Sequence, residues 1–358
     1  MRSSPSCSTS CLSPWTRHIS VAALPHRRHL AAVAGVLVSA VLLWWVLRDV
    51  DWAAVRAHVV TARLLPMLAA VGVATSTFLL RVFRWRLLLR REDDAALPWA
   101  PLWHAIAIGF MGNNVLPFRM GEVMRSYTVT RLAGVRFTAS LSSVAVERVF
   151  DGLSVVLLMA VGLVVAGLPS STEVGGVPMS RIALVSGATM GAALLAGIVV
   201  VSAPLLAERI IRRVVPPDRI ADRLVALVEG VRHGLGVLRS PVRVVSVAAW
   251  SLGLWLVNAA SFWIMFAAFD IPVGLGGALV MQGVLIFGIA VPSTPGYVGV
   301  FEAAIKAVLL LFGVGAAQAV AYAVTYHVTT FLPIVLLGAW SLARTSLGLR
   351  ELQAAPPA

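Results

Sequence analysis

The chain has 358 residues, of which 59% are apolar and 13% charged, and its mean hydropathy is +0.89. A soluble chain carries about 25% charged residues, so this composition excludes an ordinary soluble domain and indicates an all-α polytopic membrane protein. The net charge of +13 comes from arginines at the edges of apolar runs. That placement excludes a nucleic-acid-binding face and suits contact with membrane headgroups.

Residues 1–28 are rich in Ser, Pro and basic residues and lack periodicity, which predicts a disordered, basic cytoplasmic tail. Cys7 and Cys11 have no metal-ligand spacing and no partner elsewhere, so neither a disulfide nor a metal site is predicted. The apolar run 29–47 is too long for a signal peptide and lacks a cleavage site, which favours a first transmembrane helix.

Five further apolar segments have about the 20 residues needed to cross a hydrocarbon core of about 30 Å. They are residues 64–80, 138–168, 181–205, 242–269 and 317–343. The first of them runs into a cluster of arginines. Arg84, Trp85 and Arg86 in that cluster are predicted to form an interfacial anchor, with the indole at headgroup depth and the arginines on phosphates.

Two apolar segments, residues 99–135 and 272–315, are interrupted by helix-breaking residues. Irregular backbone at membrane depth is tolerated only inside protein or beside a water-filled cavity, and ionisable side chains there cost roughly 2.5–3.5 kcal/mol each. The alternative for the first segment is a cytoplasmic loop between two spans. The predicted breaks are at Pro117 and Gly121 in the first segment and at Pro295, Gly296 and Gly299 in the second.

The arginines fall on one side of the membrane if both interrupted segments are re-entrant hairpins that return to the side they entered. The positive-inside rule then places both termini in the cytoplasm. The opposite side receives arginine-free loops near residues 169–180, 269–271 and 313–316, and the first outer loop, with Arg48, Arg56 and Arg63, is the main exception. The predicted architecture is six full transmembrane helices plus two re-entrant hairpins.

An internal repeat is predicted from the two interrupted segments. Glu122 and Glu302 follow the breaks 180 positions apart, and Glu147-Arg148 corresponds to Tyr326-His327 at a similar separation. Three spans lie between the hairpins, so the halves, about 64–168 and 242–343, would enter from opposite faces, as in inverted-repeat transporters. Coincidence in low-complexity apolar sequence is the alternative.

The first interrupted segment carries the groups that favour an anionic ligand. Arg119 and Arg125 offer fork-shaped donors suited to phosphate, and Asn113 and Asn114 offer neutral donors and acceptors. Helices that begin after the breaks would also direct their positive ends into the site. This set predicts a phosphate-containing headgroup as ligand. The alternative is that Arg119 and Arg125 are anchors at the cytoplasmic surface.

Three ionisable residues follow within a predicted span, at Glu147, Arg148 and Asp151. Glu147 and Asp151 are four residues apart and therefore share a helical face. Charged groups inside a span are expected to face the protein interior and to pair there. Either a structural ion pair with Arg119 or Arg125, or direct contact with substrate, would satisfy this expectation.

The second half contributes a smaller candidate set: Ser293 and Thr294 before the break, Glu302 after it, and His327 in the last span. Glu302 and Lys306 are four residues apart and could neutralise each other. His327 could titrate near neutral pH or be a packing residue. No phosphate-binding loop, dinucleotide motif, nucleophile elbow or metal-ligand spacing occurs, so no catalytic residue, metal or cofactor is predicted. The acidic run 92–94 is a weak metal or nucleotide-sugar candidate.

The chain resembles the membrane region of lysylphosphatidylglycerol synthases, a family of flippase-like integral membrane proteins, over most of residues 30–345. The resemblance rests on three blocks: Asn114-x-Leu116-Pro117-x-Arg119-x-Gly121-Glu122-x-x-Arg125, Glu147-Arg148-x-x-Asp151, and Pro292-x-x-Pro295-Gly296-x-x-Gly299-x-x-Glu302. It implies a multi-pass protein of a bacterial inner membrane, with re-entrant helices around a central cavity, that moves lipids between leaflets.

The resemblance ends before the C-terminus. Bifunctional synthases carry a large soluble aminoacyl-transfer domain, whereas residues 346–358 here form a predicted short cytoplasmic tail, so lipid synthesis by this polypeptide is not expected. The predicted function is a flippase or transporter for a membrane lipid with an anionic headgroup. The alternatives are a membrane enzyme or subunit that uses a polyprenyl-phosphate sugar, and a scaffold for a separately encoded transferase. The sequence leaves the lipid and the oligomeric state open.

Overall fold

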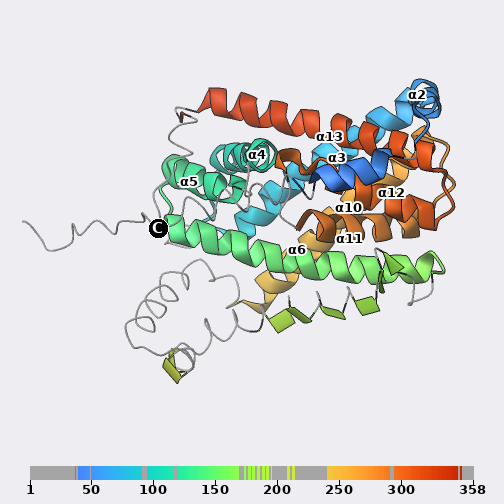
Figure 1. The fold of residues 1–358 in the computed structure, drawn as a ribbon. Coiled ribbons are helices and arrows are strands. Elements are labelled where there is room, and N and C mark those ends of the chain that lie inside the picture. Colours follow the sequence, from blue (N-terminus) through green and yellow to red (C-terminus); the bar gives the residue numbers. More distant parts are fainter. Residues whose placement is uncertain are drawn as a thin grey trace, which may run out of the picture.

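The computed structural model describes residues 37, 39–48, 50–90, 95–116, 120–168, 240–290, 294–345 and 347–348, with isolated positions between 173 and 213. These residues form a bundle of long and short α-helices (Figure 1). The two strands, β1 (Glu173–Val174) and β2 (Val177–Pro178), pair as a short antiparallel ribbon. The predicted tails 1–28 and 346–358 and most of the predicted span 181–205 lie outside the described residues.

Four helices are long and apolar enough to cross a membrane: α3 (Leu64–Leu88), α6 (Phe137–Val165), α10 (Pro241–Ala268) and α13 (Ala316–Arg344). They confirm four of the six predicted spans. In the remaining described span, predicted at 29–47, residues 39–47 are helical. The protein is therefore an all-α membrane protein in the part of the chain that the structure describes.

Each interrupted segment forms two short helices with a break where the sequence predicts one. The first contains α4 (Trp99–Val115) and α5 (Gly121–Ala133), which pack against each other. The second contains α11 (Leu275–Ala290), the 3-10 turn η3 (Pro295–Tyr297) and α12 (Val300–Leu311). At 1.5 Å per residue, the 12 residues of α12 extend only about 18 Å and the 17 of α4 about 26 Å.

The segment predicted as the first outer loop is in fact largely helical. Helix α2 (Trp52–Thr61) begins after Asp51, whose carboxylate accepts hydrogen bonds from the backbone N–H groups of Ala53 at 2.9 Å and Ala54 at 3.4 Å. This side-chain cap satisfies N–H groups that the first turn leaves unpaired, and the charge-based prediction did not consider it.

The two halves of the chain make matching helix contacts when α3, α4, α5 and α6 are set beside α10, α11, α12 and α13 in that order. Helix α3 packs against α10, while α4 packs against α13 and α11 packs against α6. Within each half, the post-break helix also contacts the long helix that follows it, α5 with α6 and α12 with α13. In Figure 1 the hairpin of α4 and α5 lies near one end of the long helices, and α11 and α12 lie near the other. An inverted internal repeat would produce this arrangement.

Two glycines allow the exchanged contacts to be close. A Cβ atom at Gly162 in α6 would lie 2.8 Å from the carbonyl oxygen of Gly276 in α11. A Cβ atom at Gly338 in α13 would lie 2.7 Å from the carbonyl oxygen of Ala107 in α4. Small residues at such crossings let backbones approach closely in membrane proteins.

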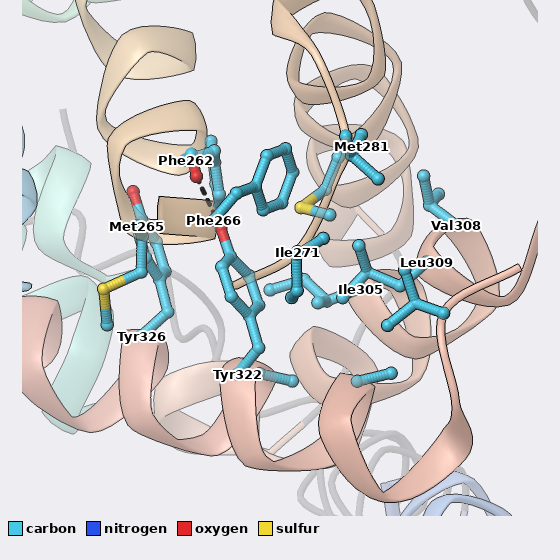
Figure 2. Packing of buried hydrophobic residues seen from close by; sticks show 14 of the residues in the cluster. Phe262, Met265, Phe266, Ile271, Met281, Ile305, Val308, Leu309, Tyr322 and Tyr326 are labelled. Atoms are coloured by element: carbon cyan, nitrogen blue, oxygen red, sulfur yellow. Dashed lines mark hydrogen bonds between the residues drawn. The ribbon is translucent and has the colours of Figure 1, made fainter. Parts of the chain in front are cut away.

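The largest apolar cluster lies in the second half, between α10, α11, α12 and α13 (Figure 2). Tyr322 is fully buried there, and its hydroxyl donates to the carbonyl oxygen of Phe262 at 2.9 Å. Met281 and Ile305 are also fully buried and join α11 and α12 to this cluster. This packing holds the second hairpin against the long helices.

Candidate functional site

A cluster of buried charged side chains lies where α3, α5, α6 and α10 meet. Its centre is Glu147 on α6, which is fully buried. The Arg125 guanidinium from α5 donates two parallel hydrogen bonds to the Glu147 carboxylate, at 2.9 and 2.8 Å. Arg84 from α3 contacts the same carboxylate at 3.0 Å, and Arg148 contacts it at 2.6 Å. Three arginines therefore surround one carboxylate.

Asp151 is the second buried carboxylate of the cluster and lies one turn beyond Glu147. It accepts hydrogen bonds from Arg84 and, at 2.8 Å, from the indole N–H of Trp255 on α10. Arg148 approaches it at 3.3 Å, and Arg84 also donates to the hydroxyl of Ser251 at 2.9 Å. The shared face of Glu147 and Asp151, predicted from their spacing, is confirmed, and Arg125 is the partner that forms the ion pair.

The prediction that Arg84, Trp85 and Arg86 form an interfacial anchor is wrong for the first two. Arg84 and Trp85 are both 0% exposed. Helix α3 continues past the predicted end at Leu80, so its inward face carries these side chains into the bundle. The Trp85 indole N–H donates to the Ser143 hydroxyl at 2.9 Å, and its ring lies 3.7 Å from the Arg125 guanidinium. Arg86 is half-buried and donates to a backbone carbonyl.

One signal in the sequence could have identified this inward face. Arg81, Arg84, Trp85 and Leu88 are spaced at i, i+3, i+4 and i+7, which is the repeat of a single helical face. All four are buried. A hydropathy window ends the predicted span 64–80 at the arginines, whereas the helical spacing of these four residues predicts that the helix continues through them.

The other predicted site residues of the first interrupted segment are partly exposed or lie outside the described chain. Glu122 is partly exposed, and its carboxylate is 4.0 Å from the Arg148 guanidinium. Asn113 and Asn114 are half-buried at the end of α4, and the buried side-chain oxygen of Asn113 has no hydrogen-bond partner among the described residues. Pro117 and Arg119 lie outside the described residues, so the place of Arg119 stays a prediction.

The second half holds a smaller polar site. The Glu302 carboxylate contacts the His327 ring nitrogen Nδ1 at 2.6 Å and accepts from the Gly299 backbone N–H at 2.7 Å. His327 also stacks on Phe301 with ring centres 4.0 Å apart. Lys306, predicted as the partner of Glu302, donates instead to the carbonyl oxygen of Val46 at 2.7 Å. The histidine is thus the side-chain hydrogen-bond partner that the structure places against Glu302.

The two breaks lie side by side. The turn η3 contacts α4, and a methyl group at Gly296 would be 3.4 Å from the carbonyl oxygen of Asn114. The backbone N–H of Thr294 donates to the Ser39 hydroxyl at 3.0 Å, and the Thr294 hydroxyl donates to the carbonyl oxygen of Val298 at 3.2 Å, so both of these contacts lie outside the arginine cluster. Pro295 is exposed, and Ser293 lies outside the described residues.

The chemistry of the main cluster suits an anion rather than a metal ion. Among the described residues no group of three His, Cys, Asp or Glu side chains could hold a metal. The acidic run 92–94 lies outside the described residues. Guanidinium groups in a shielded site bind carboxylates and phosphates strongly, because charge-assisted hydrogen bonds are stronger in the low dielectric of a protein interior than in water.

Comparison with known proteins identifies the family. The chain is 26% identical over 353 residues to "Glycosyltransferase AglD" of Haloferax volcanii, a match that covers 90% of this chain and 55% of the relative. The chain thus spans about half the length of this curated relative. Residues 32–338, which include both hairpins and the arginine cluster, match the family described as "Lysylphosphatidylglycerol synthase TM region". The chain belongs to this family of membrane proteins.

Proposed function

We propose that the protein is a lipid transporter that moves a phosphate-containing anionic lipid between the leaflets of the cytoplasmic membrane. The observation that carries the proposal is the buried cluster, in which four arginines meet three carboxylates: Arg81, Arg84, Arg125 and Arg148 against Glu122, Glu147 and Asp151. Charges inside a membrane protein are costly and mark substrate pathways by default. An excess of cations gives that pathway a preference for anions.

Arg148 is the residue through which a headgroup would enter the cluster. Its side chain is 32% exposed, whereas Arg84 and Arg125 are buried in paired hydrogen bonds. Arg148 divides its donors between Glu147, Asp151 and, more distantly, Glu122. An incoming phosphate can therefore replace carboxylate contacts at Arg148 while the two buried arginines hold the carboxylates in place.

The hairpins give the proposed path its geometry. Helices α5 and α12 extend about 20 and 18 Å at 1.5 Å per residue, less than a hydrocarbon core of about 30 Å. In this proposal both hairpins are re-entrant, the halves are inverted, and the termini are cytoplasmic. The headgroup passes between the adjacent breaks, while the acyl chains remain in lipid. Glu302 in the second half pairs with His327 as Glu147 pairs with Arg125.

A second function is favoured by the named relative. A membrane subunit or enzyme that transfers a sugar from a polyprenyl phosphate would also need a site for a lipid phosphate. The relative's name describes a glycosyltransferase, but this chain spans 55% of it. A covalently changed lipid product, with loss of activity on chelation of metal ions, would support this alternative over transport.

Replacing Arg148 with glutamine is expected to slow lipid movement about tenfold or more. The change removes a charged donor, and a hydrogen bond to a charged group contributes about 1.5–3 kcal/mol, where about 1.4 kcal/mol is a factor of ten. The measurement is quenching of headgroup-labelled phosphatidylglycerol in proteoliposomes by an impermeant reductant. The control is Arg63→Gln, because Arg63 is 62% exposed and pairs at the surface with Asp270. Equal rates for parent and Arg148→Gln would contradict the proposed entry residue, and no movement in the parent would contradict transport of this lipid.

A further inference from the structure

Arg81 is a buried cation whose donors are not satisfied by the described part of the protein. It lies on α3 one turn before Arg84, on the same inward face, and is 7% exposed. Its Nε and Nη1 atoms are buried and have no hydrogen-bond partner among the described residues. Buried polar groups in folded proteins are almost always hydrogen-bonded, so two unpaired buried donors on one cation call for a functional explanation.

The surroundings of Arg81 hold its charge without using its hydrogen-bond donors. The guanidinium carbon is 4.5 Å from the ring centre of Phe110 on α4 and 5.8 Å from that of Trp255 on α10. Aromatic faces attract a cation, but they accept no strong hydrogen bond. The Trp255 indole N–H donates to Asp151, so this ring also contacts the buried charged cluster. The two rings therefore hold a guanidinium whose Nε and Nη1 donors have no acceptor among the described residues.

Arg81 also leaves the cluster with a surplus of positive charge. With Arg81 the described residues supply four arginines, at 81, 84, 125 and 148, against the carboxylates of Glu147, Asp151 and the partly exposed Glu122. Asp151 is already occupied by Arg84 and Trp255. One further negative charge would balance the site, and it would find its donors at Arg81.

Arg81 lies against α4 at Phe110, between one and two turns before the C-terminal end of that helix. Phe110 precedes Asn113 and Asn114 by three and four residues on α4, so the ring beneath Arg81 and the two amides lie on one side of that helix. The side-chain oxygen of Asn113 also has no partner among the described residues. A Cβ atom at Gly121 would be 2.6 Å from this oxygen, so the second unsatisfied group lies at the start of α5, about one turn beyond Phe110 along α4.

We propose that Arg81 is the residue that binds the phosphate of the transported headgroup. This inference rests on the proposed function and adds to it a binding residue outside the family signature blocks. Arg84 and Arg125 hold the buried carboxylates, Arg148 admits the anion, and Arg81 receives it. The two non-bridging oxygens of a phosphodiester match the guanidinium fork, and the aromatic walls exclude water from the contact.

The test compares unliganded stability with ligand binding in the same variant. In nonionic detergent, Arg81→Met is expected to melt at or above the parent temperature, because it removes an uncompensated buried charge. It is also expected to lose the stabilisation that short-chain phosphatidylglycerol gives the parent, with at least a tenfold higher apparent Kd. Arg81→Lys keeps the charge without the fork and is expected to bind with intermediate affinity. Arg63→Gln, at the exposed start of α3, should match the parent in both measurements.

Each outcome separates the inference from the function beneath it. Parent protein that phosphatidylglycerol and phosphatidylcholine stabilise equally, or not at all, would overturn both. A response of the parent to dimethyl phosphate as strong as to the lipid, together with its loss in Arg81→Met, would support Arg81 as an anion site but overturn lipid transport. Selective binding in the parent that persists unchanged in Arg81→Met or Arg81→Lys would overturn the inference alone. Lower melting temperatures in both variants, with affinity retained, would show Arg81 to be structural.

Discussion

Replacing Glu147 with alanine is expected to prevent the protein from reaching or keeping its folded state in detergent. Glu147 is fully buried and contacts Arg84, Arg125 and Arg148. Without it, three arginines would face one another with Asp151 as the remaining buried carboxylate. Removing one partner of a buried ion pair costs about 3–5 kcal/mol, and this carboxylate serves three partners. A loss of this size is comparable to the whole stability of many domains.

The measurement is the yield of monodisperse protein after extraction, followed by the melting temperature. Asp270→Asn is the matched control, because Asp270 is also a carboxylate paired with an arginine, yet it is 65% exposed. Exposed pairs contribute about 0–1 kcal/mol, so this variant should behave as the parent. Normal yield and melting temperature for Glu147→Ala would show that the cluster does not hold α5, α6 and α3 together.

Replacing Gly121 with alanine is expected to separate the helices of the first hairpin. A Cβ atom at Gly121 would lie 1.8 Å from the carbonyl oxygen of Gly109 and 2.6 Å from the backbone nitrogen of Asn113. Both obstacles are backbone atoms of α4, so no side-chain rotation relieves the clash. Overpacking in cores costs about 1–3 kcal/mol where side chains can shift, and more is expected here. Loss of the hairpin should abolish lipid movement even in protein that can be purified.

Gly72→Ala provides the control for a glycine change. Gly72 lies within α3, and nothing lies within 4 Å of a Cβ atom placed there. Alanine is favoured over glycine in a helix by about 1 kcal/mol, so this variant should melt slightly above the parent. Protease sensitivity of the hairpin in Gly121→Ala, set against resistance in Gly72→Ala, measures the effect. Equal resistance and equal transport would contradict the close contact of α4 and α5.

The sequence alone predicts the elements whose signals are local. Hydropathy over about 20 residues locates α3, α6, α10 and α13, and the Pro and Gly residues locate both breaks. The i, i+4 spacing of Glu147 and Asp151 places both on the inward face, and their position inside a span predicts cationic partners. These inferences need no knowledge of which helices are neighbours.

The features that the sequence did not predict depend on contacts between distant segments. A window of hydropathy places Arg84 and Trp85 at the interface, because it cannot distinguish an arginine facing headgroups from one facing a buried carboxylate 67 positions away. The partner of Glu302 is likewise His327 rather than the nearby Lys306, since the packing of α12 against α13 decides which side chains meet. Hydropathy does not indicate helix α2, whose local signal is the single capping residue Asp51.

The exchanged packing of α4 with α13 and of α11 with α6 makes the two halves interdependent. Each hairpin finds its long neighbour in the opposite half, so a chain containing only residues 64–168 would expose the surface of α4 that α13 covers. Neither half can bury this surface by itself, and co-expressed halves should reassemble where either alone is degraded.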